Sequence, residues 1–194
     1  KKNIELAISM ISSNIHTKNV IYVGNAVSAA AITENEKEIG VIQADIGGGT
    51  ISFTVYDSGK QLISQGISDG GDYITNSIAR EFGLPKQSAE QLKIQYGIAS
   101  PDLIPEDQRG YQISIEVPSQ LSNKSEEVTI AIVDLSNVIH SCLLNMFELL
   151  FQRITSHGRS FLKSLDIGAG VVLTGGTAKL YGIDRVLSEF IVAY

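Results

Sequence analysis

The feature that most constrains this chain is a run of three glycines between two strand-like segments. The run stands in Ala44-Asp45-Ile46-Gly47-Gly48-Gly49-Thr50. An apolar segment at 40–46 precedes it, and Ile51, Phe53 and Val55 after it alternate with polar residues at the period of two that is typical of a half-buried strand. Because glycines carry no side chain, the backbone N–H groups of this loop can closely approach a bound anion. The sequence therefore predicts a phosphate-binding hairpin.

Other glycine-rich phosphate-binding motifs do not match the residues of this loop. A P-loop requires Lys and then Ser or Thr after its last glycine, and a dinucleotide-binding turn requires Gly-x-Gly-x-x-Gly opening a helix. Here a strand-like segment follows, and an ordinary glycine-rich turn would have no evident need for three glycines. Asp45, at the end of the first strand, is a candidate ligand for hydrated Mg²⁺, because this hard cation binds carboxylates and retains water. The Thr50 hydroxyl could orient a water molecule or a phosphate oxygen.

Two further motifs indicate a ligand-binding site only in combination with this loop. In the segment 173–180 a strand-like stretch runs into Gly175-Gly176, where bare backbone can lie against a planar base, although a tight turn explains the same pair. Glu90 and Lys93 stand three residues apart on a predicted helix, so they share a face and can hydrogen-bond ribose hydroxyls. A solvated ion pair is the alternative for these two side chains.

The first part of the chain predicts alternating helices and strands. Isoleucines recur at spacings of four and three over residues 4–15, which is typical of an amphipathic helix. A turn at 57–59 and an apolar segment at 61–67 predict a third strand, so that the three strands form an antiparallel meander. The other expectations are a short buried strand at 20–23, a close-packed helix at 26–32, an exposed connection at 34–38, and a helix running from Asp72, as its cap, through Phe82.

From residue 83 to 163 the composition changes, which suggests an inserted subdomain. Prolines and glycines punctuate short strand-like pieces at 112–117 and 128–133, and a long helix follows with Asp134 as its predicted cap. Beyond that helix, a buried strand at 170–173 enters the second glycine motif and a helical turn follows at 177–181. The long helix has an apolar stripe typical of a core-facing surface, made of Leu135, Val138, Ile139, Cys142, Met146, Leu149 and Leu150.

Charge and composition exclude several functions. The 194 residues are 43% apolar, enough for a real core, but the net charge of −6 supplies no basic field, so no nucleic-acid partner is expected. The single Cys142 cannot form an internal disulfide and the three histidines show no metal-ligand spacing, which favours a reducing, cytoplasmic setting. No segment approaches the roughly 20 apolar residues that span a bilayer. Because the first residue is Lys rather than Met, we expect a piece of a longer protein.

These motifs together resemble a known superfamily. The glycine loop, the string Gly170-Val-Val-Leu-Thr-Gly-Gly176 and the helix with Glu90 and Lys93, in this order and spacing, are similar to the actin, Hsp70 and sugar-kinase ATPases. Finer strings resemble the FtsA family of bacterial cell-division proteins. These strings are Thr33-Glu-Asn-Glu-Lys-Glu-Ile-Gly40, Ala79-Arg-Glu-Phe-Gly83, Ser88-Ala-Glu-Gln-Leu-Lys93 and Ile115-Glu-Val-Pro-Ser119.

The resemblance implies a fold and a set of ligands. The expected fold is α/β, a ribonuclease H-like, actin-type ATPase lobe with an inserted α+β subdomain. Its expected parts are a remnant of first-lobe subdomain 1A at 1–33, subdomain 2A with the phosphate and adenine loops at 34–82 and 164–194, and inserted subdomain 2B at 83–163. The implied cofactors are ATP and Mg²⁺.

The resemblance assigns each site residue a role. Asp45 would face Mg²⁺ through water, and Asp45 and Thr50 are the candidates for catalysis. The implied nucleotide-binding residues are Gly47, Gly48, Gly49 and Thr50 for the phosphates, Gly70 and Gly71 at the cleft edge, Glu90 and Lys93 for the ribose, and Gly175, Gly176, Ala178 and Lys179 for the adenine.

For the whole protein, the resemblance implies a filament-forming adaptor. It would bind the C-terminal tail of FtsZ and other divisome proteins at the septum, on the inner face of the cell membrane, and reach the membrane only through a C-terminal helix absent from this sequence. Asn145 and Arg153 on the long helix are the partner-binding candidates, with ordinary solvent-facing positions as the alternative. Ser141-Cys142 replace a Pro-Arg pair that relatives often carry there.

One departure bears on activity. Many relatives carry Glu-Pro where this chain has Val23-Gly24, and that carboxylate could help activate water, so we expect ATP binding with slow or no hydrolysis. Two other functions stay open. One is an MreB- or PilM-like scaffold that does not contact FtsZ, against which the string Glu116-Val-Pro-Ser119 argues. The other is a sugar or acetate kinase, which would need an acceptor pocket with a carboxylate base, and no such cluster is evident beyond Asp45.

Overall fold

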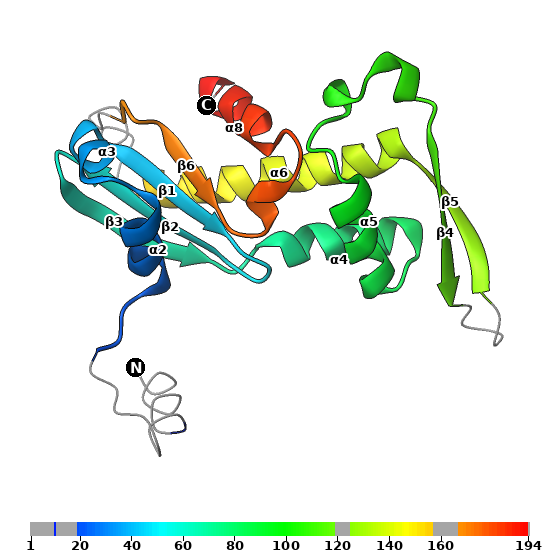
Figure 1. Cartoon of the computed structure of the whole chain (residues 1–194), viewed down its shortest axis with the longest axis horizontal. Helices are drawn as coiled ribbons and strands as arrows, with labels where there is room; N and C mark the ends of the chain where they lie inside the picture. The colour runs from blue at the N-terminus through cyan, green and yellow to red at the C-terminus, as the bar shows by residue number, and fades with distance from the viewer. Residues whose placement is uncertain (1–9, 11–18, 119–124, 157–166, 194) are drawn as a thin grey trace.

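A four-stranded sheet forms the centre of the computed structural model, which describes residues 10, 19–118, 125–156 and 167–193. The strands are β1 (Val41–Ile46), β2 (Ile51–Asp57), β3 (Lys60–Ile67) and β6 (Val171–Thr174), in the order β3-β2-β1-β6 (Figure 1). The first three are antiparallel neighbours, which confirms the predicted meander. β6 pairs with β1 in parallel, with Asp45 opposite Thr174. This pairing places the ends of β1 and β6, and therefore both glycine motifs, side by side.

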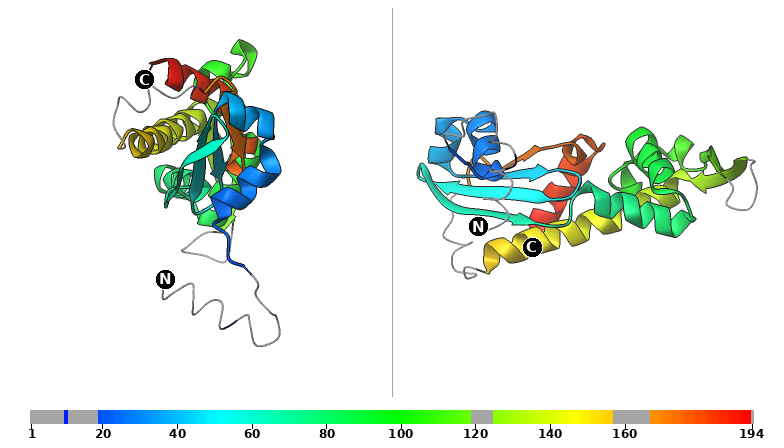
Figure 2. Two further views of the ribbon diagram at one scale, coloured as in Figure 1. Left: turned by 90° about the vertical axis from the view of Figure 1, so that its left-hand side faces the viewer. Right: turned by 90° about the horizontal axis from the view of Figure 1, so that it is seen from below.

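Helices cover both faces of this sheet. α2 (Val23–Ala31) and α3 (Glu34–Ile39) lie on one face, and α6 (Ile132–Thr155) lies on the other, with α8 (Ile183–Ala193) packed against α6 (Figure 2). As a result, β2 is buried on both faces from Ile51 to Tyr56, and the prediction of a half-buried strand is wrong. β6 is an edge strand and only partly buried, so the prediction of a buried strand at 170–173 is wrong as well.

The other described elements include a separate two-stranded sheet, which lies at the opposite edge of the molecule from the four-stranded sheet (Figure 1). They are α4 (Gly71–Phe82), α5 (Lys86–Tyr96), the short 3₁₀ helices η1 (Pro101–Leu103), η2 (Glu106–Gln108) and η3 (Thr177–Lys179), and the antiparallel strands β4 (Gln112–Pro118) and β5 (Ser125–Ala131). α6 runs from β5 back along the four-stranded sheet (Figure 1). It packs against α4, with Asn145 in the middle of α6 contacting Tyr73, and also against β3 and α8. The division into subdomains 1A, 2A and 2B stays a prediction.

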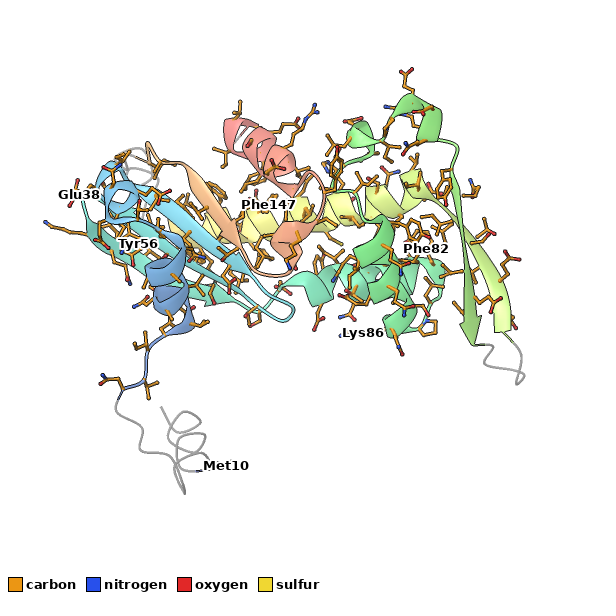
Figure 3. All side chains as sticks on the ribbon, viewed as in Figure 1. Met10, Glu38, Tyr56, Phe82, Lys86 and Phe147 are labelled. Atoms are coloured by element: carbon orange, nitrogen blue, oxygen red, sulfur yellow. The ribbon has the colours of Figure 1, made fainter. Side chains whose placement is uncertain are left out.

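The apolar stripe of α6 faces the core as expected. Leu135, Ile139 and Met146 are completely buried, whereas Leu149 is exposed. Phe147, labelled in Figure 3, packs its ring against that of Phe190 on α8 with the centroids 5.9 Å apart. In the described ranges, no helix has both the length and the apolar character needed to cross a membrane.

Several local predictions are wrong. Residues 20–22 form no strand, and Val20 and Ile21 are exposed, because no described element packs on them. The segment 34–38 is helical, since Thr33 and Glu36 form a capping box at the start of α3. Asp72 and Asp134 are not caps, because the helices start earlier, after Gly70 and Ala131, which leaves both carboxylates in the first turn, where the helix dipole favours them. The predicted helix at 4–15 falls, except for Met10, outside the described residues.

Candidate functional site

The glycine loop after β1 rests on the first turn of α4. The Gly47 N–H donates to the Thr50 carbonyl at 3.0 Å, which closes the loop. The carbonyls of Gly47 and Gly48 accept hydrogen bonds from the N–H groups of Gly71 (2.8 Å) and Asp72 (2.7 Å). The loop is therefore held through its carbonyl oxygens, by helix N–H groups that would otherwise have no partner within the helix.

Two amide groups of this loop, those of Gly48 and Gly49, remain available to a ligand. Gly48, Gly49 and Thr50 are exposed, and within the described residues the N–H groups of Gly48 and Gly49 have no hydrogen-bond partner. A Cβ added to Gly48 would come no closer than 3.8 Å to its neighbour, Asp72, and one added to Gly49 would meet nothing within 4 Å. Unpaired amides on an exposed loop suit an anion.

Other glycines of the motifs are required by close backbone packing. A Cβ on Gly70 would lie 2.6 Å from the carbonyl oxygens of both Gly47 and Gly48. Gly175 has φ +91°, and its Cβ would collide with the Ile46 carbonyl oxygen. The glycines at 70 and 175 thus allow α4 and β6 to pack closely against the loop, whatever they do for a ligand.

Asp45 lies at the end of β1, half-buried and beside the second glycine motif. Its Oδ1 accepts a hydrogen bond from the Thr174 hydroxyl at 3.0 Å. Across the part of the chain that the structure describes, no group of three His, Cys, Asp or Glu side chains could hold a metal ion. A cation at Asp45 would therefore have one carboxylate and otherwise water or ligand oxygens, which is the coordination that Mg²⁺ commonly retains.

Glu90 and Lys93 share a face of α5, as predicted, and they contact each other. Lys93 Nζ lies 2.7 Å from Glu90 Oε2, 2.8 Å from Thr75 Oγ1 and 3.1 Å from the Gly71 carbonyl oxygen. The Lys93 side chain is 10% exposed and that of Glu90 is 40% exposed. Burial alone would raise the pKa of Glu90, but the hydrogen bonds from Lys93 and Thr75 and the charge of Lys93 outweigh it, so the pKa lies below its usual value.

This lowered pKa predicts an acid-dependent loss of stability. The pKa of Glu90 is depressed in the folded state, so its contribution is present above the unfolded value of about 4.5 and is lost as the pH falls through the folded value. We expect the wild-type chain to exceed Glu90→Gln in melting temperature at pH 6, and the difference to shrink below pH about 4.5. Thermal unfolding followed by circular dichroism from pH 7 to 3 measures this.

The matched control for this experiment is Glu189→Gln. Glu189 pairs with Arg185 on α8, and both side chains are 62% exposed. Exposed ion pairs contribute little, so this variant should follow the wild type. A difference in melting temperature between wild type and Glu90→Gln that stays constant down to pH 3 would contradict the expectation.

A cleft of about 550 Å³ opens between the glycine loop, α5 and the segment after β6. It is lined by five of the predicted residues, namely Gly48, Glu90, Lys93, Gly176 and Lys179. The other predicted residues, Gly47, Gly49, Thr50, Gly70, Gly71, Gly175 and Ala178, are not part of this lining. Sequence reasoning missed Asp72, Ile94, Gln95, Gly97, Thr177, Leu180 and Tyr181.

The missed residues carry little local signal. Ile94 and Tyr181 are apolar side chains that are 71% and 66% exposed, a property that the sequence does not reveal. Asp72 is predicted as a helix cap rather than as a cleft residue, and Thr177 lies inside the second glycine motif. Asn145 and Arg153, the partner-binding candidates, are exposed on α6 and do not line the cleft, and the Asn145 amide donates to the Tyr73 hydroxyl at 3.4 Å.

Comparison with known proteins decides the family. The family model described as "Cell division protein FtsA" matches residues 42–193. The chain belongs to the FtsA family. It is 31% identical over 191 residues to cell division protein FtsA of Escherichia coli. The aligned region covers 94% of this chain and 42% of that protein. It is 34% identical over 158 residues to FtsA of Neisseria meningitidis, covering 81% and 36% respectively. The chain therefore spans less than half the length of these FtsA relatives.

A solved structure shows the fold. MreB5 of Spiroplasma citri, in a crystal structure bound to AMPPNP, superposes with a TM-score of 0.78 at 18% identity, covering 99% of this chain and 58% of that one. The expected actin-type ATPase fold is thereby confirmed. Among the alternatives, the FtsA family model favours a cell-division protein over an MreB- or PilM-like scaffold or a metabolic kinase.

Proposed function

We propose that this FtsA-family chain is the nucleotide-binding lobe of an actin-like, ATP-binding cell-division protein. The observation that carries the proposal is the pair of N–H groups at the exposed residues Gly48 and Gly49, which have no hydrogen-bond partner within the described residues. They follow Asp45 in the loop, and Gly48 lines the cleft. The cleft volume of about 550 Å³ lies in the usual range for small-ligand pockets. The ATP analogue AMPPNP bound to MreB5, which shares this fold, supports the same ligand class.

The residues of the site fit the parts of Mg·ATP. Gly47, Gly48, Gly49 and Thr50 would receive the phosphates, and Asp45 would hold Mg²⁺ through water. Glu90 and Lys93 would contact the ribose, where the exposed part of the Glu90 carboxylate can accept a hydrogen bond from a hydroxyl. The segment 175–179 would lie against the adenine, with Gly70 and Gly71 at the cleft edge. Bound Mg²⁺ would neutralise phosphate charge.

We propose further that hydrolysis is slow or absent. Phosphoryl transfer depends on a positioned water and on charged groups around the reacting phosphate. Val23-Gly24 stand where many relatives are expected to carry Glu-Pro, and Gly24 is buried at the start of α2. This chain thus supplies no carboxylate at these two positions to orient the water.

In the cell, the whole protein would tether FtsZ to the inner membrane at the septum and form filaments. Its partners would be the C-terminal tail of FtsZ, other copies of itself and further divisome proteins, and a C-terminal helix outside this sequence would contact the membrane. The exposed side chains of Asn145 and Arg153 on α6 are the candidates for partner contact. The membership in the FtsA family supports this role.

Two titrations on one sample test the proposal. In the full-length protein, meaning this chain with whatever flanks it in the cell, calorimetry should detect saturable binding of Mg·ATP. A peptide of the FtsZ tail should bind with a dissociation constant on the order of tens of micromolar. Absence of nucleotide binding would overturn the first part of the proposal. Nucleotide binding without tail binding would instead favour a scaffold of the MreB or PilM kind, and steady ATP consumption dependent on a small acceptor would favour a kinase.

A further inference from the structure

A buried polar side chain interrupts the apolar interior of β1. Gln43 is completely buried in the middle of this strand, where its neighbours Ile42 and Ala44 belong to the core. Burying an amide costs free energy unless its hydrogen bonds are made. Gln43 makes them at both ends of its side chain, since its Nε2 donates to Thr174 Oγ1 at 2.9 Å, and its Oε1 lies 3.2 Å from Ser28 Oγ and 3.4 Å from Thr54 Oγ1.

The charge of Asp45 fixes the direction of these hydrogen bonds. An ionised carboxylate only accepts, so the single hydroxyl proton of Thr174 goes to Asp45 Oδ1 at 3.0 Å. The Thr174 oxygen is then an acceptor for Gln43, which must present its Nε2 to β6 and its Oε1 to the hydroxyls of Ser28 and Thr54. The amide orientation of Gln43 and the aspartate rotamer are thus set together.

We propose that Gln43 is a positioning residue for Asp45, acting through the Thr174 hydroxyl. This inference rests on the proposed Mg·ATP function. Held at Oδ1, Asp45 has no further hydrogen bond in the described part of the chain, so Oδ2 remains available to a water molecule on the cation. Groups that orient a metal-binding side chain by hydrogen bonding commonly change metal affinity when they are removed.

The far end of the same network lies on α2. Ser28 and Thr54 are fully buried and hydrogen-bonded to each other, and the Ser28 hydroxyl also lies 2.8 Å from the Gly24 carbonyl oxygen. Among the described residues, no buried side-chain nitrogen or oxygen lacks a partner. Loss of the Gln43 amide would therefore release Thr174, and through it Asp45, from a network that also includes α2.

The Mg²⁺ dependence of ATP binding tests the proposal in the full-length protein. Gln43→Leu and Thr174→Val should each raise the Mg²⁺ concentration for half-maximal enhancement of ATP binding by about tenfold. Neither should alter ATP affinity measured in excess EDTA, because the phosphate-binding amides remain. Thr174→Ser, which keeps the hydroxyl, should restore the wild-type Mg²⁺ dependence.

The matched control is Ser64→Ala. The Ser64 hydroxyl donates to Asn25 Oδ1 at 2.7 Å and so links β3 to α2 without contact to Asp45. This variant should keep the wild-type Mg²⁺ dependence. Equal losses of affinity with Mg²⁺ and in EDTA for Gln43→Leu and Thr174→Val would mean a merely structural role and would overturn the proposal.

A second readout requires no nucleotide. By NMR, the side-chain amide protons of Gln43 should exchange slowly with solvent and show a nuclear Overhauser effect to the Thr174 methyl group. Fast exchange and no such effect in the wild type would overturn the network itself. Failure of the wild type to bind Mg·ATP would overturn the proposed function and with it this inference. Normal Mg·ATP binding with an unchanged Mg²⁺ dependence in Gln43→Leu and Thr174→Val would overturn the inference alone.

Discussion

Gly48→Val should abolish Mg·ATP binding by the full-length protein while leaving its thermal stability unchanged. The exposed Gly48 lacks the positive φ that strains other residues, and an added Cβ would meet nothing nearer than 3.8 Å, so the folded chain tolerates a side chain there. We expect the valine side chain to hinder the close approach of a phosphate to the loop's N–H groups, which glycine allows. We expect affinity to fall by at least a factor of about 100, which corresponds to roughly 2.8 kcal/mol. Calorimetric titration and thermal unfolding measure the two quantities.

The matched control for this variant is Gly110→Val. Gly110 is also exposed, lacks a positive φ, and has nothing within 4 Å of an added Cβ, but it does not line the cleft. It should bind Mg·ATP like the wild type. If Gly48→Val retained wild-type affinity at an unchanged melting temperature, the loop would be only a turn and the proposed phosphate site would be wrong.

Asp45→Ala should remove the Mg²⁺-dependent part of ATP binding. Asp45 is the carboxylate that closes β1 beside the loop, and within the described residues it belongs to no larger cluster of metal-ligating side chains, so none would replace it. Asp45→Asn keeps an oxygen acceptor for Thr174 but lacks the charge, and it should behave in the same way. We expect Mg²⁺ to strengthen ATP binding at least about tenfold in the wild type and hardly at all in either variant, a difference of roughly 1.4 kcal/mol.

Asp57→Ala is the control for the aspartate variants. Asp57 ends β2 at the hairpin turn, at the opposite end of the sheet from Asp45, and should leave the Mg²⁺ dependence unchanged. The measurement is ATP titration at a series of free Mg²⁺ concentrations and in EDTA. A wild-type Mg²⁺ response in Asp45→Asn would show that the cation, if bound, is held elsewhere.

Local patterns predicted the three-stranded meander well, because each of its strands is defined by its own residues. The apolar run at 41–46, the alternation from Ile51 and the turn at 57–59 sufficed for a meander. The helix at 34–39 also has a local signal, since Thr33 and Glu36 have the capping-box spacing, although its run of charged residues is equally typical of an exposed connection. At Val20 and Ile21 the apolar sequence predicts a buried strand, but both side chains are exposed in the structure.

The cleft could be predicted only in part. Both glycine motifs and the Glu90–Lys93 pair have sequence signals, but Tyr181 and Ile94 have none. A β-bridge between Ile98 and Tyr181 joins the end of α5 to the segment after β6, more than eighty residues later, and so brings these side chains to one cleft. No local pattern specifies such a contact.

The meander, the two glycine motifs and the family follow from the order of residues along the chain, because each is carried by neighbouring or regularly spaced residues. Which amides stay unpaired depends on tertiary contacts, since the N–H groups in the first turn of α4 bind the carbonyls of Gly47 and Gly48, whereas those of Gly48 and Gly49 have no partner in the part of the chain that the structure describes. The tertiary structure also decided that Gln43 faces Thr174, 131 residues away, rather than solvent. Hydrogen bonds between distant segments form only after the sheet has brought its strands together, so their partners cannot be read from neighbouring letters.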